Sequence, residues 1–258
     1  MKLYDYLNEL RCVIPEEMQE EWDNTGIQVN TGDKDIKRVL TALEITADVI
    51  EEAIEKSADM IVTHHPLIFG GTKSINSENA LGRYLIKLIK EDIAVYSCHT
   101  NFDKLPGGNN DTLCKLMGLT DVEYIAGDDI TRMGQCKPQT LREFAENLAS
   151  ALDADIESFN IVGDPDTEIN KAGCCTGAGS EYLEIAKVCG CDLFVTGDLK
   201  HHEARTAEEA GICVIDAGHY GTEKIFPKAF IDIMKANDFD DEIEFIESEC
   251  CRSPWFKL

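Results

Sequence analysis

The chain has 258 residues, of which 43% are hydrophobic, and this is typical of one large or two modest globular domains. Its 49 acidic and 24 basic side chains give a formal net charge of −25, which argues against a basic face that binds nucleic acid. No apolar run approaches the 18 residues of a membrane span, and the acidic N-terminus has no secretory signal, so we expect a cytoplasmic protein.

The first half of the chain predicts strands that alternate with helices. Apolar runs predict strands, and apolar residues spaced by three and four predict helices. The strands are expected at 37–46, 59–65 and 93–99, and the helices at 47–58 and 77–92. Ser77 is the expected N-cap of the second helix, with Glu78 in its first turn. This alternation is typical of a largely parallel sheet that is covered by helices.

The second half repeats this plan after a stretch of predicted strands and turns at 120–136. Strands are expected at 157–163, 171–177, 191–197, 212–219 and 243–249. Helices are expected at 139–152, 180–190, 201–211 and 222–238. The third of these helices ends at Gly211, and Pro227 is expected to interrupt the fourth.

Two pairs of segments look like copies of each other. DMIVTHHP (59–66) matches DLFVTGDL (192–199), and IAVYSCHTNFDK (93–104) matches ICVIDAGHYGTEK (212–224) with a one-residue gap. We therefore predict an internal duplication and an α/β fold of two similar halves, each a mixed, largely parallel sheet with flanking helices. The halves are expected at 1–125 and 126–258, with the C-terminal strand packing back on the first half.

All the histidines lie at, or just beyond, the C-terminal ends of the four matching strands, where open α/β sheets bind ligands. They are His64, His65, His99, His201, His202 and His219. Asp103 and Glu223 each follow a histidine by four residues, and if 219–223 opens a helix, this spacing places His219 and Glu223 on one face of it. Imidazole and carboxylate together suit Zn, Fe, Mn, Ni or Co. The alternative for Glu223 is a first-turn acid that complements the helix dipole.

The adjacent histidines suggest more than one metal ion. Successive side chains of a strand face opposite ways, so His64 and His65 are expected to serve two ions better than one. Pro66 would take the backbone out of the strand at this point. A bridging carboxylate would hold the ions about 3.5–4 Å apart, the spacing of two-metal hydrolytic sites.

The eleven cysteines include no C-x-x-C pair, and residues such as Cys98 and Cys213 fall inside apolar runs. We interpret them as reduced thiols that pack like small core residues. A disulfide scaffold or a zinc knuckle is the alternative.

Several stretches resemble the Nif-three-like dinuclear metal-binding family, often labelled type-2 GTP cyclohydrolase I. They are EWDNTGIQV (21–29), VTHHPLIF (62–69), HTNFDK (99–104), TGDLKHHEA (196–204) and GHYGTEK (218–224). The resemblance implies a dinuclear site in the cleft between two similar halves, and a toroidal homohexamer. It implies that the metal ligands are His64, His65, Asp103, His219 and Glu223. One ion would take His65, Asp103 and Glu223, and the other His64, His219 and the bridging Glu223.

We therefore expect a hydrolase that depends on two divalent ions per subunit, and a small anionic or nucleotide substrate. The family label suggests opening of the purine ring of GTP, with proton transfer by His99, His201 or His202. Lys104 or Lys200 could meet a phosphate group. The alternative is a metal-binding, regulatory or metal-delivery protein without turnover. We expect no nucleic-acid and no membrane partner.

Overall fold

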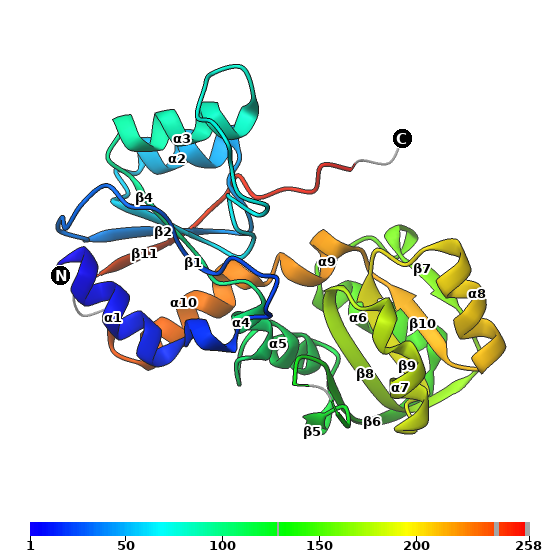
Figure 1. The fold of residues 1–258 in the computed structure, drawn as a ribbon. Helices are drawn as coiled ribbons and strands as arrows, with labels where there is room; N and C mark the ends of the chain where they lie inside the picture. The colour runs from blue at the N-terminus through cyan, green and yellow to red at the C-terminus, as the bar shows by residue number, and fades with distance from the viewer. Residues whose placement is uncertain (128, 240–242, 256–258) are drawn as a thin grey trace. The chain divides into compact units, whose positions relative to one another are not determined.

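The predicted alternation of strands and helices is present in both halves of the chain, which form two α/β units (Figure 1). The computed structural model describes residues 1–127, 129–239 and 243–255. We call Met1–Leu105 with Phe226–Arg252 unit 1, and Pro106–Ile225 with the C-terminal residues from Ser253 unit 2. Within the described residues no helix combines the length and the apolar character that crossing a membrane requires.

Unit 1 is built on a five-stranded sheet in the order β1-β4-β3-β2-β11. Four of its strands are parallel: β2 (Arg38–Ala42), β3 (Met60–Thr63), β4 (Ala94–Ser97) and β11 (Glu244–Glu247). The remaining strand, β1 (Gly26–Val29), pairs antiparallel with β4. Helices α1 (Leu3–Val13) and α10 (Phe226–Ala236) pack on one face, and α2 (Ala47–Glu55) and α3 (Ala80–Lys90) on the other. The central strands are buried because helices cover both faces.

Unit 2 has a six-stranded sheet in the order β5-β6-β8-β9-β10-β7. Its parallel centre consists of β8 (Glu168–Ala178), β9 (Leu193–Gly197) and β10 (Cys213–Asp216). Antiparallel strands flank it: β5 (Thr120–Tyr124), β6 (Arg132–Thr140) and β7 (Asn160–Val162). Helices α5 (Asn109–Leu116) and α6 (Leu141–Ala151) pack on one face, and α7 (Leu183–Val188) and α8 (His201–Ala210) on the other.

Short helices complete the chain. Two five-residue helices, α4 (Thr100–Lys104) and α9 (His219–Glu223), follow the last parallel strand of each repeat. The 3₁₀ turns whose bounds lie within the described residues are η1 (Glu16–Met18), η2 (Ile156–Ser158) and η3 (Ser180–Tyr182). Side chains of α4 and α9 therefore project from the carboxyl edge of each sheet.

The two units repeat one order of elements. The run α1-β1-β2-α2-β3-α3-β4-α4 corresponds to α6-β7-β8-α7-β9-α8-β10-α9. In both, the strand that comes first pairs antiparallel with the last parallel strand, as β1 does with β4 and β7 with β10. The fold is thus an α/β fold of two similar halves.

The helix that follows each repeat along the chain belongs to the unit formed by the other repeat. Helix α5 follows α4 but packs against β8 of unit 2, and α10 follows α9 but packs against β2 of unit 1. The expected boundary after residue 125 differs from this division, because residues 106–125 belong to unit 2 and residues 226–252 to unit 1. An amphipathic pattern shows that a helix buries one face, but it does not show against which sheet.

Two local expectations were wrong. Asn79, not Ser77, caps α3, and its side-chain oxygen accepts a hydrogen bond from the Gly82 amide at 2.8 Å. Pro227 does not interrupt a helix, because it lies in the first turn of α10, where its missing N–H has no intrahelical partner to lose. The segment before it is the separate helix α9.

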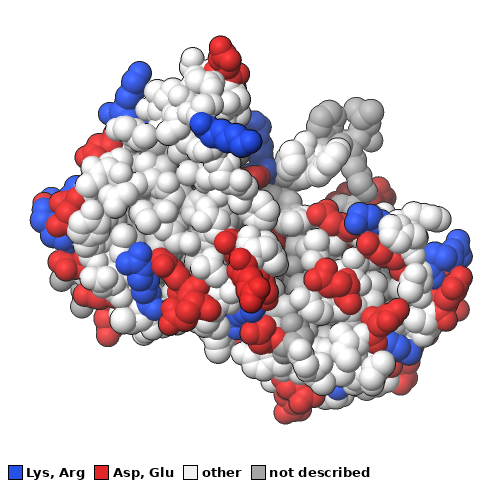
Figure 2. Space-filling view, viewed as in Figure 1, with Lys and Arg blue, Asp and Glu red and all other residues white. Residues whose placement is uncertain are grey.

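Acidic side chains dominate the surface charge. The chain has 49 acidic and 24 basic side chains, and on the face seen in Figure 2 the red acidic groups cover more of the surface than the blue basic ones. All eleven cysteines lie within the described residues and outside any disulfide, and most of them are buried. Burial raises the pKa of Cys98 and Cys191, which keeps both as uncharged thiols.

Candidate metal centre

Each unit carries a cluster of imidazole and carboxylate side chains at an equivalent place in the repeat. In unit 1 the cluster lies where β3 and β4 end and α4 begins. In unit 2 it lies where β9 and β10 end and α9 begins. Both are therefore at the carboxyl edge of adjacent parallel strands, where α/β sheets bind ligands.

In unit 1, His64 and His65 follow β3 directly. The backbone amides of both residues donate to the carbonyl oxygen of Leu43, at 3.1 and 2.9 Å, so the chain bends out of the strand here. The sequence predicted that the two rings face opposite ways. They do not, because the strand has ended and its alternation of side chains no longer applies. Their centroids are 5.3 Å apart, with planes tilted by 38°. His65 Nδ1 is also 3.9 Å from Glu44 Oε2.

The buried His64 is held in one orientation. Its Nδ1 lies 2.8 Å from the carbonyl oxygen of Cys98, which can only accept a hydrogen bond. Nδ1 must therefore carry the proton, and neutral His64 has an unprotonated Nε2. This Nε2 lies 3.7 Å from Oδ2 of the buried Asp103. A histidine anchored through one nitrogen, with the other beside a carboxylate, is the usual arrangement of a metal ligand.

His99 joins this cluster. A ring nitrogen of each of His64, His65 and His99 lies within 4.8 Å of the others, which is close enough for the three to hold one metal ion. His99 was expected only near the ligands, because sequence spacing cannot show how β3 and β4 align side by side. Its ring lies 5.0 Å from that of His64, between centroids.

Asp23 anchors His99. Its buried carboxylate lies 2.8 Å from His99 Nδ1 and also accepts hydrogen bonds from the amide and the hydroxyl of Thr100. Burial raises the pKa of Asp23, but the hydrogen bonds from His99 and Thr100 outweigh it and hold this pKa well below its usual range. The ionised Asp23 fixes the proton of neutral His99 on Nδ1, so that Nε2 is the basic atom.

In unit 2, His219 lies between two carboxylates. Its Nδ1 is 2.8 Å from Asp198 Oδ2, and its Nε2 is 2.9 Å from Oε2 of the buried Glu223. The predicted four-residue spacing thus brings His219 and Glu223 together on α9. Gly177, at φ +68°, makes room for this carboxylate, since a Cβ there would lie 2.3 Å from Glu223 Oε1.

Asp198 is a functional candidate that the sequence analysis did not name. It occupies the place in the second repeat that His65 occupies in the first, and it sits at φ +55° directly after β9. The match of 59–66 with 192–199 contains this correspondence, so the signal was present in the sequence. For Asp23 the only signal was its place in the family stretch 21–29.

The other proposed side chains lie apart from these contacts. His201 and His202 are exposed in the first turn of α8, and His202 Nε2 is 3.8 Å from Glu203 Oε1. In the part of the chain that the structure describes, no hydrogen bond or ion pair joins either of them to the unit 2 cluster. Lys104 is buried and pairs with Glu20 at 2.7 Å, so it is not available for a phosphate group.

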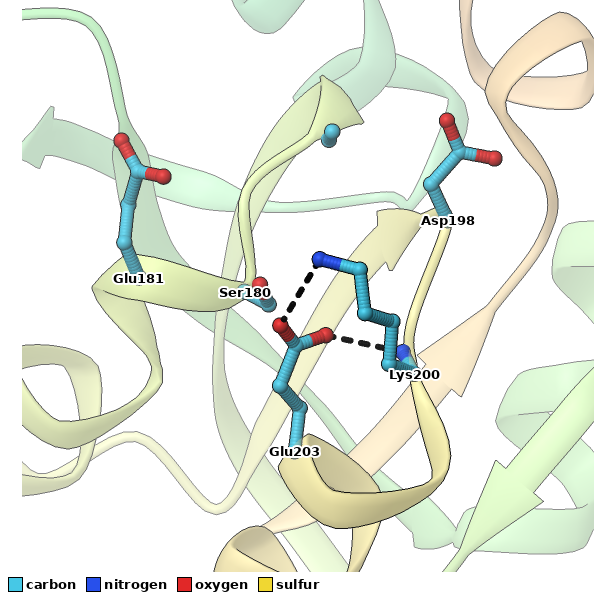
Figure 3. Close-up of a pocket in the computed structure, with 6 residues that line it drawn as sticks. Ser180, Glu181, Asp198, Lys200 and Glu203 are labelled. Atoms are coloured by element: carbon cyan, nitrogen blue, oxygen red, sulfur yellow. Dashed lines mark hydrogen bonds and ion pairs between the residues drawn. The ribbon is translucent and has the colours of Figure 1, made fainter.

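A pocket of about 460 Å³ adjoins Asp198 in unit 2 (Figure 3). It is lined by Ala178, Ser180, Glu181, Asp198, Lys200 and Glu203. The Lys200 ammonium group points toward Glu203, with Nζ 3.5 Å from Oε1 (Figure 3). Three carboxylates and one ammonium group give the lining a negative charge, which disfavours a phosphate ligand.

The donor set of both clusters fits a divalent transition metal. Imidazole nitrogens combined with carboxylate oxygens suit Zn, Fe, Mn, Ni or Co, whereas all-oxygen sites suit Mg and Ca. In unit 2, a neutral His219 that donates from Nδ1 has an unprotonated Nε2. This nitrogen and Glu223 Oε2 each carry a lone pair that can bind a metal ion, and the two atoms are 2.9 Å apart. A cation would relieve that contact.

Comparison with known proteins gives full-length matches. A family model described as Duf34/NIF3 (NGG1p interacting factor 3) matches residues 1–254. A Clostridium perfringens protein named GTP cyclohydrolase 1 type 2 homolog is 35% identical over 265 residues, covering 99% of each chain. The structure of a Staphylococcus aureus hypothetical protein superposes with a TM-score of 0.94 at 29% identity, covering 100% of this chain and 99% of that one. Reduced HcgD from Methanocaldococcus jannaschii gives a TM-score of 0.82 at 28% identity, covering 96% and 98%.

Proposed function

Since the chain belongs to the Duf34/NIF3 family, we propose that its two clusters supply one dinuclear metal site and that the protein is a metal-dependent hydrolase. The proposed ligands are His64, His65 and Asp103 from unit 1, and His219 and Glu223 from unit 2, with Glu223 bridging. The observation that carries the proposal is the anchoring of His64 and His219 through Nδ1, which leaves Nε2 beside a carboxylate in each unit.

The protein's own residues divide the work of such a hydrolase. Divalent ions bound there would lower the pKa of a water molecule toward about 7 and polarise the bond to be cleaved. His99, fixed by Asp23, would take up or deliver a proton at Nε2, the ring nitrogen that faces away from the carboxylate. Asp198 would orient His219 in the same way that Asp23 orients His99.

GTP is the first substrate to test, because several relatives carry the name GTP cyclohydrolase 1 type 2 homolog. Hydrolytic opening of its purine ring would also need proton transfer, for which His99 is the best-placed group. The negative pocket of unit 2 makes Lys200 a poor phosphate partner. We therefore expect the phosphate groups of an anionic substrate to lie outside that pocket.

The test combines metal content with turnover. We expect about two metal ions per chain in the wild type by plasma emission, loss of both in Glu223→Ala, and loss of mainly one in His64→Ala or His65→Ala. GTP, simpler purines and phosphate esters are then assayed with Mn, Fe or Zn restored after chelation. Activity should fall below about pH 6, as ligand imidazoles protonate and release metal. Two tightly held ions in Glu223→Ala would rule out the bridge.

The second candidate is a metal-binding or metal-delivery protein without turnover. It is favoured by the three imidazoles of unit 1, which lie close enough together for His99 to be a third ligand of one ion instead of a proton carrier. His99→Ala separates the two functions, because it lowers metal content in the delivery protein but lowers turnover at constant metal content in the hydrolase. If no substrate turns over faster with wild type than with Glu223→Ala, in any metal form, the delivery function replaces the hydrolase.

The homohexamer implied by the family resemblance is also a proposal. Sedimentation equilibrium should then give six times the 28.7 kDa mass of the chain. A monomer at micromolar concentration would contradict it.

A further inference from the structure

Two large aromatic side chains are exposed beside the unit 1 cluster. Trp22 and Phe69 are 60% and 57% exposed, although rings of this size are usually buried or used for binding. Their centroids are 5.9 Å apart, with planes tilted by 57°. Each ring also lies 6.0 Å from the His99 ring and nearly perpendicular to it. The pair therefore borders the imidazole that is proposed to transfer protons.

The loops that carry these rings are braced against each other. The Asn24 side chain donates to the Ile68 carbonyl oxygen at 2.5 Å, and the Ile68 amide donates to Gln28 Oε1 at 3.2 Å. Asp23, the residue after Trp22, holds His99. The family stretch 21–29 thus positions the aromatic pair and the histidine together, so the exposure of the rings belongs to an ordered arrangement.

We propose that Trp22 and Phe69 form a stacking site for a planar heteroaromatic ring of a small molecule, held against His99. A tilted pair offers the face of one ring and the edge of the other, which is how aromatic rings prefer to meet a third ring. The side-chain amides of Asn24 and Gln28 donate to oxygen atoms of these loops, so the stacking rings supply the contact with the ligand. The inference rests on the proposed function only for the role of His99.

The size of the exposed surface argues for a small molecule and against a protein partner. Together the exposed parts of the two rings amount to on the order of 200 Å². A stable protein interface needs about 800 Å² on each side. A single bicyclic ring, by contrast, is well matched to two aromatic side chains.

The chain allows a direct binding test, because Trp22 and Trp255 are its only tryptophans. In a Trp255→Phe, Glu223→Ala background, Trp22 is the sole indole and turnover does not interfere. We expect inosine and adenosine to quench Trp22 fluorescence saturably, and ribose to have no effect. Phe69→Leu should raise the dissociation constant about tenfold, in line with the loss of one stacking partner. Phe69→Tyr should restore it.

Tyr4→Leu is the matched control, since Tyr4 is an aromatic residue of unit 1 that is 47% exposed on α1. It should leave nucleoside binding unchanged. Equal quenching by ribose, or an unchanged dissociation constant in Phe69→Leu, would overturn the stacking site. The stacking site would also be overturned if Trp22 emission, measured without ligand, shifted with protein concentration and this shift disappeared in Phe69→Leu. That result would mean that a second copy of the chain covers the two rings. Nucleoside binding in this background, together with no turnover by the metal-loaded wild-type protein, would leave the stacking site standing and remove only the hydrolase.

Discussion

At the scale of single residues, the partner of Nδ1 decides what each imidazole can do. His64 donates to a carbonyl oxygen, whereas His99 and His219 face carboxylates. A carboxylate partner raises the basicity of the opposite nitrogen more than a neutral oxygen does. His64 is thus oriented by a neutral oxygen, whereas His99 and His219 are oriented by carboxylates.

Asp23→Asn tests this difference. The substitution keeps the shape but removes the charge beside His99, and it replaces an acceptor of the Thr100 hydrogen bonds. We expect turnover to fall about 10- to 100-fold, with a shifted pH profile and unchanged metal content. The exposed neighbour Glu21, changed to Gln, serves as the control and should have no effect. Loss of metal in Asp23→Asn would show that His99 is a ligand and not a proton carrier.

Gly177→Ala tests the room left for Glu223. At φ +68° any side chain costs about 1 kcal/mol, and here a Cβ would also clash with the carboxylate. Gly211 has the same φ of +68° with no atom within 4 Å of such a Cβ, so Gly211→Ala pays only the backbone cost. We expect a larger loss of unfolding free energy in Gly177→Ala than in Gly211→Ala, and a lower metal content only in Gly177→Ala. Equal metal content in the two variants would argue against Glu223 as a ligand.

At the scale of elements, one buried carboxylate of α2 binds the residues that follow β11. Glu52 of α2 accepts hydrogen bonds from the Ser248 hydroxyl and the Glu249 amide, and pairs with Lys56 at 2.8 Å. Burial raises the pKa of Glu52, but the hydrogen bonds from Glu249, Lys56 and Ser248 prevail and lower it to about 2. The end of β11 is therefore held by a charge as well as by strand pairing.

Glu52→Gln should lose a pH-dependent part of the stability. A carboxyl whose pKa is depressed on folding stabilises the fold fully above its unfolded pKa of 4.5, and this contribution is lost as pH falls toward 2. We expect Glu52→Gln to lower the free energy of unfolding by about 2 kcal/mol at pH 7, allowing for solvent screening, and by less than half of that at pH 3. Urea unfolding at both pH values measures this difference. The exposed Glu55→Gln is the control, and a loss in Glu52→Gln that does not vary with pH would contradict the assignment.

At the scale of the whole molecule, the exchange of α5 and α10 makes unit 1 discontinuous in sequence. Helix α10 contributes the buried Phe226, Phe230 and Met234 to its core, and Phe226 lies 4.9 Å from Phe102 between ring centroids. Burial of three such side chains is worth about 5 kcal/mol or more, which approaches the entire stability of a typical domain. Unit 2 has its core within one continuous stretch.

Isolated fragments should reflect this difference. We expect residues 106–225 to fold alone, with a cooperative thermal transition in circular dichroism. Residues 1–105 should stay largely unfolded, and a peptide of residues 226–252 should restore a cooperative transition when added. A fragment 1–105 that unfolds cooperatively without the peptide would show that α10 and β11 are dispensable.

The sequence by itself determined what each segment is, and to a large extent what chemistry it carries. Strand and helix periods, the Gly211 stop and the His219–Glu223 spacing depend on residues a few positions apart, so they can be read locally. The apolar spacing of Leu3, Leu7 and Leu10 in α1 is a local signal of the same kind. Only the tertiary structure decided which segments meet: Asp23 with His99, Gly177 with Glu223, and α10 with the sheet of unit 1. Such contacts depend on packing energy spread over many distant side chains, and no single segment contains that information.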